Sequence, residues 1–217
     1  MTKAELDRLG ERLRLGVSAD DLTMLDAYRR GFRPSYEEVL VRVRDELALQ
    51  VSGRPAKSTA AIVDKLRRGS IRLTQMQDIA GCRIVVPDVS HQNRVLSVLN
   101  GIYDDAGIFD RRTRPSSGYR AVHLIVRRLD LPVEIQIRTD LQHVWAELSE
   151  KLADKHGIYL KYGGGPESVR RTLLDYSDII FEFEQHLDTD SGQDSRISQL
   201  KLSIRQAMVN VTKASSQ

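Results

Sequence analysis

The segment VEIQIRT (133–139) alternates apolar and polar residues without a break. Laid out as a strand, it turns its three apolar residues to one face and its polar residues to the other. The polar residues are Glu134, Gln136 and Arg138. The run GYRAVHLIV ends shortly before, and the connection RRLDL is short enough to predict an antiparallel hairpin. The polar face of the second strand either meets water, as in most half-buried strands, or lines a site.

Helical spacing of apolar residues accounts for much of the remaining chain. The first fifty residues read as helices, and a capping box, Ser35 with Glu38, is expected to start the third. Between these helices and the hairpin, a helix is predicted over AAIVDKLRR. It is followed, near Asp78, by a predicted buried strand, CRIVVPD. Further helices are predicted over 91–103, LQHVWAELSEKLAD, VRRTLLDYSDIIFEFEQHL and ISQLKLSIRQAMV.

The last two predicted helices carry apolar stripes, which indicate buried faces. The first stripe is Val169, Leu173, Tyr176, Ile180 and Phe183. The second is Ile197, Leu200, Ile204 and Met208, and it suits a helix that docks on its own domain or on a partner. The stretches DDAGIFDRRTRPSSG and DTDSGQDS read as a polar loop and a linker. Helices before and after a small sheet predict an α+β fold.

Composition excludes several classes of protein. With 41% hydrophobic and 29% charged residues, the chain is an ordinary globular protein. No apolar run approaches the ~18 residues that span a bilayer, and the charged start MTKAELDRLGERL is unlike a signal peptide, so we expect a cytoplasmic protein. The single cysteine, Cys82, is expected to be buried and inert. A net charge of +3 suits a polyanionic ligand and leaves nucleotide, RNA and plain surface open.

Two acids stand out by their location. Asp78 lies at the entrance of the first strand, and Glu134 lies inside the second strand of the hairpin. Carboxylates on adjoining strands can converge to bind Mg2+, which prefers a few carboxylate oxygens together with waters and phosphate oxygens. The alternative for Asp78 is a turn or helix-capping residue.

Basic residues surround these acids along the sequence. They are Arg54, Lys57 and Lys65 before the first strand, Arg83 within it, and Arg111, Arg112 and Arg114 in the loop before the hairpin. Tyr119 follows that loop. Cations around an acid pair, with one exposed aromatic ring, suit a magnesium-bound nucleoside triphosphate and a second, stacked base. Each charge taken singly is more often a solvated surface residue.

Other catalytic motifs are absent from the sequence. There is no G-x-x-x-x-G-K-[ST], which excludes a P-loop. His143 and Glu147 are four residues apart on one predicted helix, but HVWAE is not HExxH, so zinc is not expected. Ser116 and Ser117 lack a G-x-S-x-G context, and nothing favours acyl transfer.

In order and spacing, MQDIAGCRIVV, SGYRAVHLIV and VEIQIRTDLQHVWAELSEK resemble the synthetase domain of the RelA/SpoT family. Enzymes of this family move pyrophosphate from ATP to a nucleoside 3′-hydroxyl. The resemblance implies a nucleotidyltransferase-like, mixed five-stranded sheet flanked by helices. It places N-terminal helices packed on the core at 1–50, the synthetase domain at 51–187, and a linker with a C-terminal helix at 188–217.

The resemblance also implies a role for each matching residue. Asp78 and Glu134 would be the catalytic and metal-binding acids, and Arg54 and Arg83 would hold the adenine of ATP. Lys57 and Lys65 would bind phosphates, with Ser58 in the same loop. Tyr119 would stack on the acceptor base, with four polar residues nearby. These are His123, Gln136, Arg138 and His143.

Two departures from the family pattern leave open, respectively, the roles of Arg54 and Ser58 and the identity of the acceptor. The usual R-x-K is R-x-x-K here, with Ala61 where a serine is common, and the loop FDRRTRPSSG diverges from the family. The leading hypothesis is a Mg2+-dependent pyrophosphokinase that uses GDP or GTP. The alternatives are a toxic small synthetase acting on the tRNA 3′ end or on adenine nucleotides beside an antitoxin, and a silent nucleotide- or RNA-binding domain. No His-Asp dipeptide is present, so no hydrolase domain is expected, and the expected assembly is a homo-oligomer.

Overall fold

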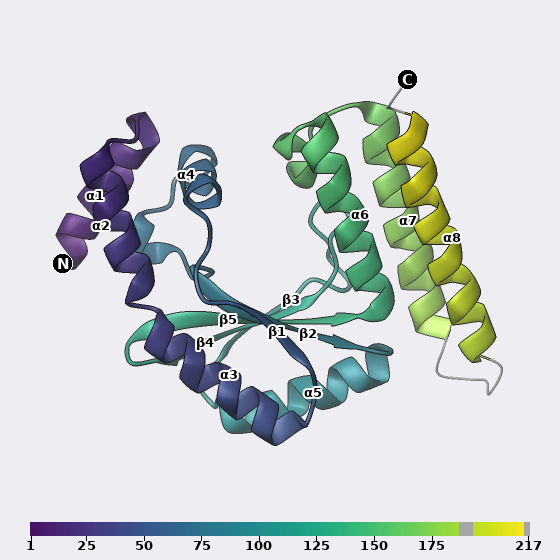
Figure 1. Ribbon diagram of the computed structural model, residues 1–217. Helices are drawn as coiled ribbons and strands as arrows, with labels where there is room; N and C mark the ends of the chain where they lie inside the picture. The colour runs from purple at the N-terminus through teal and green to yellow at the C-terminus, as the bar shows by residue number, and fades with distance from the viewer. Residues whose placement is uncertain (187–192, 215–217) are drawn as a thin grey trace. The chain divides into compact units, whose positions relative to one another are not determined.

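The computed structural model describes residues 1–186 and 193–214 and confirms the α+β fold (Figure 1). A mixed, five-stranded sheet has the strand order β1-β2-β5-β4-β3. The strands are β1 Val51–Arg54, β2 Ala80–Val86, β3 Gly107–Asp110, β4 Val122–Arg128 and β5 Leu131–Thr139. The α-helices are α1 Lys3–Leu15, α2 Ala19–Arg30, α3 Arg33–Leu47, α4 Thr59–Arg68, α5 Val89–Ile102, α6 Asp140–His156, α7 Glu167–His186 and α8 Gln193–Ala214. Two short 3-10 helices are η1 Leu73–Gln75 and η2 Ile158–Tyr162.

The chain divides into two compact units, each made of three segments. The first unit comprises 1–84, 98–108 and 123–136, and the second comprises 85–97, 109–122 and 137–217. The domain boundaries at 50 and 187 come from the family resemblance, whereas these units are defined by compactness, so the boundaries stay predictions. Each unit is described by itself below.

In the first unit, side-chain caps mark the starts of α1 and α2, within the stretch predicted to be helical. The hydroxyl groups of Thr2 and Ser18 accept hydrogen bonds from backbone N–H groups in the first turns, which satisfies donors that a helix start leaves open. Gly10 lets α1 approach η1 closely, because a Cβ there would lie 3.0 Å from the Cβ of Leu73. The N-terminal helix thus packs directly on the segment that leads to Asp78.

The capping box predicted for the third helix is wrong. Helix α3 begins at Arg33, and Ser35 lies inside it, fully buried. Phe32 is the N-cap residue, without a side-chain hydrogen bond, and Pro34 occupies the first turn. Proline is favoured there because its missing N–H and fixed φ suit a helix start, and burial of Phe32 fixes where the chain enters the helix.

The strands expected from apolar patterning are present, and two short ones were missed by that patterning. Strand β2 alternates buried and half-buried residues, and β1 pairs with it antiparallel, Gly53 opposite Cys82. Strand β3 lies in the stretch predicted to be a polar loop, which corrects that prediction. Both missed strands have four residues and lie at the edges of the sheet, so pairing with a neighbour, rather than their own sequence, makes them strands.

Strands β4 and β5 form the predicted hairpin. Leu129 and Asp130 connect them, with φ angles of 48° and 63°. Positive φ at both central residues is typical of a two-residue turn whose twist matches that of the flanking strands, and only antiparallel strands can be joined so tightly. The hairpin therefore fixes the register in which His123 and Glu134 face each other.

In the second unit, α6, α7 and α8 lie side by side, drawn in green to yellow in Figure 1. The stripe on α7 is confirmed, because Leu173 and Ile180 are buried and its other members pack against the same cluster. On α8, Ile204 is fully buried in this cluster and Leu200 packs against it, so this helix docks within its own unit. The side chains of Ile197 and Met208 lie outside the described part.

No helix among the described residues is long and apolar enough to span a bilayer. Cys82 is 5% exposed, as expected, and burial raises the pKa of its thiol to about 12, so the thiol is protonated and unreactive at neutral pH.

Candidate active site

Asp78 lies between two lysines in the first unit. Its Oδ2 is 2.6 Å from Lys57 Nζ, and its Oδ1 is 2.9 Å from Lys65 Nζ. A backbone hydrogen bond of 2.6 Å from the N–H of Lys57 to the carbonyl of Ile79 fixes the loop before α4 against the start of β2. The turn or capping alternative for Asp78 is therefore wrong, because its carboxylate pairs with both cations.

This pairing sets the ionisation of Asp78. Burial raises the pKa of the carboxyl, but the charges and hydrogen bonds of Lys57 and Lys65 outweigh burial and hold the pKa at about 2. Burial lowers the pKa of Lys57, and the charge of Asp78 opposes that shift. At neutral pH Asp78 is a carboxylate.

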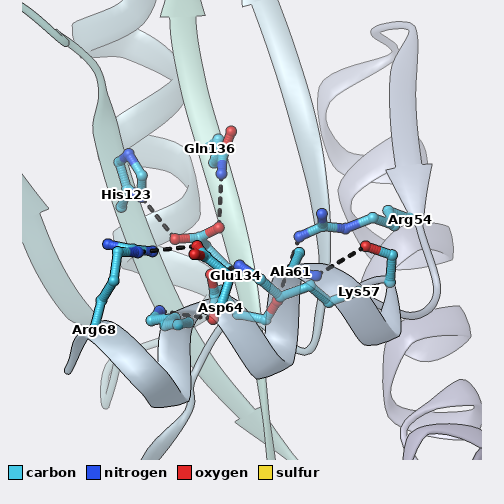
Figure 2. Close-up of polar contacts among 11 residues, drawn as sticks. Arg54, Lys57, Ala61, Asp64, Arg68, His123, Glu134 and Gln136 are labelled. Carbon is cyan, nitrogen blue, oxygen red and sulfur yellow. Dashed lines mark hydrogen bonds and ion pairs between the residues drawn. The ribbon is translucent and has the colours of Figure 1, made fainter. Parts of the chain in front are cut away.

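Glu134 accepts hydrogen bonds from two neighbours on the hairpin. Its Oε1 is 2.7 Å from His123 Nδ1, and its Oε2 is 2.7 Å from Gln136 Nε2. Figure 2 shows the carboxylate between these two side chains. Burial raises the pKa of Glu134, but His123 and then Gln136 outweigh burial and the net shift is downward. The charge of Asp78 also acts on Glu134, so the two acids share one electrostatic environment.

A glycine that the sequence analysis missed allows β2 and β5 to approach closely beside Glu134. A Cβ on Gly81 would lie 2.7 Å from the carbonyl oxygen of Glu134 and 3.3 Å from its Cβ. The signal in the sequence was a glycine inside a strand, next to the apolar run that ends in Ile84, Val85 and Val86, since a glycine in a strand often marks a close backbone approach.

The other predicted residues of this unit have varied contacts. The guanidinium of Arg54 donates to the backbone carbonyl of Asp78 at 3.4 Å. The hydroxyl of Ser58 caps α4 by accepting from the N–H of Ala61 at 3.3 Å, which gives it a structural task. Arg83 is half-buried on β2, opposite Ser52 of β1.

The two acids are residue types that fit a divalent cation. No group of three or more His, Cys, Asp or Glu side chains gathers as a metal site among the described residues. Asp78 and Glu134 offer four carboxylate oxygens, and each oxygen keeps a second lone pair beside its present hydrogen bond. Two carboxylates completed by phosphate oxygens are a donor set that Mg2+ accepts.

In the second unit, Tyr119 and Arg138 contact each other. Arg138 is 5% exposed, and its Nη2 donates to the hydroxyl of Tyr119 at 2.9 Å. The ring of Tyr119 is half-buried, with its centroid 6.4 Å from that of Trp145. His143, on α6, lies 3.5 Å from the carboxylate of Glu147. Five predicted residues thus contact Asp78 or Glu134, namely Arg54, Lys57, Lys65, His123 and Gln136, and Arg138 contacts Tyr119. The contacts described for Ser58, Arg83 and His143 are with other residues.

Known proteins match this chain over much of its sequence. A family model described as "Region found in RelA / SpoT proteins" matches residues 53–159. An uncharacterised protein of Mycobacterium tuberculosis is 37% identical over 154 residues, which make up 63% of this chain and 56% of that protein. The chain therefore spans little more than half the length of this relative. GTP pyrophosphokinase YjbM of Bacillus subtilis is 33% identical over 159 residues, 66% of this chain and 72% of the relative.

Solved structures are similar over a larger share of the chain. Small alarmone synthetase 1 from Bacillus subtilis, bound to its product pppGpp, has a TM-score of 0.62 at 27% identity, covering 76% of this chain and 95% of that one. Its structure bound to AMPCPP has a TM-score of 0.57 at 25% identity, covering 81% and 98%. With the fold of these small synthetases and a sequence match across most of YjbM, this chain belongs to the RelA/SpoT family.

Proposed function

We propose that this protein transfers the β,γ-pyrophosphate of ATP to the 3′-hydroxyl of GDP or GTP, giving AMP and (p)ppGpp. The main observation behind the proposal is that Asp78 is ionised, largely buried and paired with two lysines, and that its charge acts on the carboxylate of Glu134. The names of the relatives support it, because YjbM is a GTP pyrophosphokinase and the synthetase from Bacillus subtilis was solved with pppGpp and with AMPCPP.

Lys57 and Lys65 would bind the donor nucleotide, ATP, through its phosphates. Lys57 and Lys65 exchange part of their contact with Asp78 for the phosphates of ATP, so two cations are already in place before the nucleotide binds. Asp78 and Glu134 are the residues that would hold Mg2+, which supplies charge neutralisation on the phosphates when bound. Phosphoryl-type transfer needs positioning and charge neutralisation more than covalent help from the protein.

Glu134 suits the acceptor hydroxyl. In the transfer, the 3′-oxygen forms a bond to the β-phosphorus, the bond from the β-phosphorus to the bridging α,β-oxygen breaks, and AMP leaves with that oxygen. The hydroxyl proton passes to a carboxylate oxygen of Glu134, which is ionised at neutral pH because its pKa is lowered. His123 and Gln136 orient the carboxylate through their hydrogen bonds.

Tyr119 suits the acceptor base. Its half-buried ring is held by the hydrogen bond from Arg138 to its hydroxyl, and a fixed ring stacks on a base without losing further rotational freedom. Arg138 and Glu134 belong to the same strand, β5.

A single competition assay tests the proposal. ATP labelled at the γ-phosphate is incubated with Mg2+ and an equimolar mixture of GDP, GTP, ADP and bulk tRNA, and products are separated by chromatography and gel. We expect label on the guanine nucleotides and its loss in Glu134→Gln. Label only on tRNA or on ADP would replace the guanine acceptor, and no transfer to any acceptor would leave a silent nucleotide-binding domain.

A further inference from the structure

The segment between α4 and β2, residues 69–79, joins two groups that meet at the candidate active site; we call it the connector. Lys65 lies in the last turn of α4, and Asp78 lies near the end of the connector, just before β2. Outside η1 the connector consists of bends and irregular loop. The 2.9 Å contact between Lys65 and Asp78 therefore depends on what holds this segment in place.

Helix α1 lies beside α4 and η1 in the first unit (Figure 1). Asp7, Gly10 and Arg14 of this helix are three and four residues apart, a spacing that places side chains on one face. The neighbouring Leu9 and Leu13 are fully buried and hold the helix on the core. The face formed by Asp7, Gly10 and Arg14, which we call the α1 brace, contacts the connector at three places.

Arg14 binds the start of the connector. Its Nη2 donates to the backbone carbonyl of Gly69 at 3.1 Å and to that of Ile71. The N–H of Gly69 in turn donates to the carbonyl of Lys65 at 3.0 Å, at the C-cap of α4. In the opposite direction, Nε of Arg67 donates to the backbone carbonyl of Arg14 at 3.2 Å. The turn of α4 that carries Lys65 is therefore tied to α1 by side chains of both helices.

Asp7 binds the second half of the connector. Its Oδ1 accepts hydrogen bonds from the hydroxyl of Thr74 at 2.6 Å and from the N–H of Thr74 at 3.3 Å. Its Oδ2 lies 3.8 Å from Nε of Arg72. Between the two polar contacts, Gly10 leaves room for the close approach of Leu73 described above. The backbone at Thr74, which leads directly to Asp78, is thus fixed to α1.

We propose that Asp7 and Arg14 are positioning residues of the ATP site, which hold the connector so that Lys65 meets Asp78. The inference rests on the proposed function, because that function assigns Lys65 to the phosphates of ATP and Asp78 to Mg2+. An α-helix is a rigid spacer, and its rise of 1.5 Å per residue sets about 10 Å between Asp7 and Arg14. Two anchors at a fixed separation hold both halves of the connector, and a preformed site loses less conformational freedom when ATP binds.

The polar character of the brace favours positioning over stabilisation alone. Burial of Leu9 and Leu13 already attaches α1 to the core, and apolar burial is non-directional. Hydrogen bonds depend on angle as well as distance, so the contacts of Asp7 and Arg14 fix where the connector lies. Both side chains act on backbone or side-chain groups of the connector, the segment whose path places Lys65 relative to Asp78.

Binding of the ATP analogue AMPCPP with Mg2+ tests the inference without an acceptor or turnover. Isothermal titration calorimetry gives the Kd for wild type, Asp7→Ala, Arg14→Ala and Asp7→Asn, which keeps a carbonyl oxygen for Thr74. Arg8→Ala is the matched control, because Arg8 is exposed on α1 and donates to Ala4 of the same helix. We expect binding weaker by roughly three- to tenfold in Asp7→Ala and Arg14→Ala, about the value of one charge-assisted contact, and near wild-type binding in Asp7→Asn and Arg8→Ala. Thermal melts confirm that each variant is folded at the temperature of the titration.

A second background separates positioning from general stability. If the brace acts through Lys65, Asp7→Ala should add little to the loss caused by Lys65→Met, because effects within one contact network are not additive. An equal loss in both backgrounds, or a wild-type Kd in both alanine variants, overturns the inference. If wild type binds AMPCPP and the variants behave as expected, but no guanine nucleotide is labelled, the inference stands and the proposed function fails. If wild type does not bind AMPCPP, both fail.

Discussion

Replacing Gly81 by alanine should move the backbone of Glu134 and reduce both stability and turnover. The added Cβ would lie 2.7 Å from the carbonyl oxygen of Glu134, whereas ordinary contact begins near 3.4 Å, so one strand must shift by about 0.7 Å, the difference of the two. Overpacking of this kind costs about 1–3 kcal/mol. For a chain of this size each kcal/mol lowers Tm by roughly 2–4 °C.

The same shift displaces the carboxylate that we propose as proton acceptor. A misplacement of ~1 Å can cost ~10²-fold in rate, so we expect kcat to fall by roughly 10- to 100-fold while KM for ATP changes less. Gly101→Ala is the matched control, because a Cβ at Gly101 near the end of α5 meets nothing within 4 Å and should not destabilise the protein. Thermal melts and steady-state kinetics measure both effects. Wild-type Tm and kcat in Gly81→Ala would refute the close approach of β2 and β5 as the reason for this glycine.

Three further changes have defined outcomes. Because the pKa of Asp78 is about 2 in the fold against an ordinary 3.8, its ionisation stabilises the fold above pH ~4 by about 2 kcal/mol, and this contribution disappears as pH falls from ~4 to ~2. Urea unfolding should therefore find Asp78→Asn less stable than wild type at pH 7, with the gap closing near pH 2. Tyr119→Ala should raise the acceptor KM by the loss of ~1–3 kcal/mol of stacking and leave the KM for ATP nearly unchanged in steady-state kinetics. Ile204→Ala should cost about 2–5 kcal/mol in urea unfolding, because Ile204 is fully buried, whereas Leu202→Ala, 66% exposed, should change stability by less than ~0.5 kcal/mol.

The sequence predicted those parts of the site that depend on local periodicity. Alternation in VEIQIRT places Glu134 and Gln136 on one face of β5, and hairpin pairing brings His123 to the same carboxylate. Alternation is a property of the strand itself, so no tertiary contact is needed to predict it.

Contacts between distant segments could not be read in the same way. Lys57 and Lys65 were expected near phosphates, but their pairing with Asp78 depends on how the loop before α4 packs against β2. Likewise, nothing local distinguishes Arg112, which is bound internally, from Arg111 and Arg114, which are exposed. Identical side chains in one loop acquire different tasks only through their tertiary neighbours.

The division of the chain into interleaved segments has a consequence for how this protein can be dissected. The first unit is interrupted after residue 84 until 98 and again after 108 until 123, and it ends at 136. Neither unit is therefore one continuous stretch of chain. Expressing residues 1–84 or 137–217 alone would leave out segments that complete each unit, including parts of β2, β4 and β5. Fragment complementation would need several pieces at once, and a protease cut within one unit releases no foldable half. Unfolding is therefore expected to be a single cooperative transition.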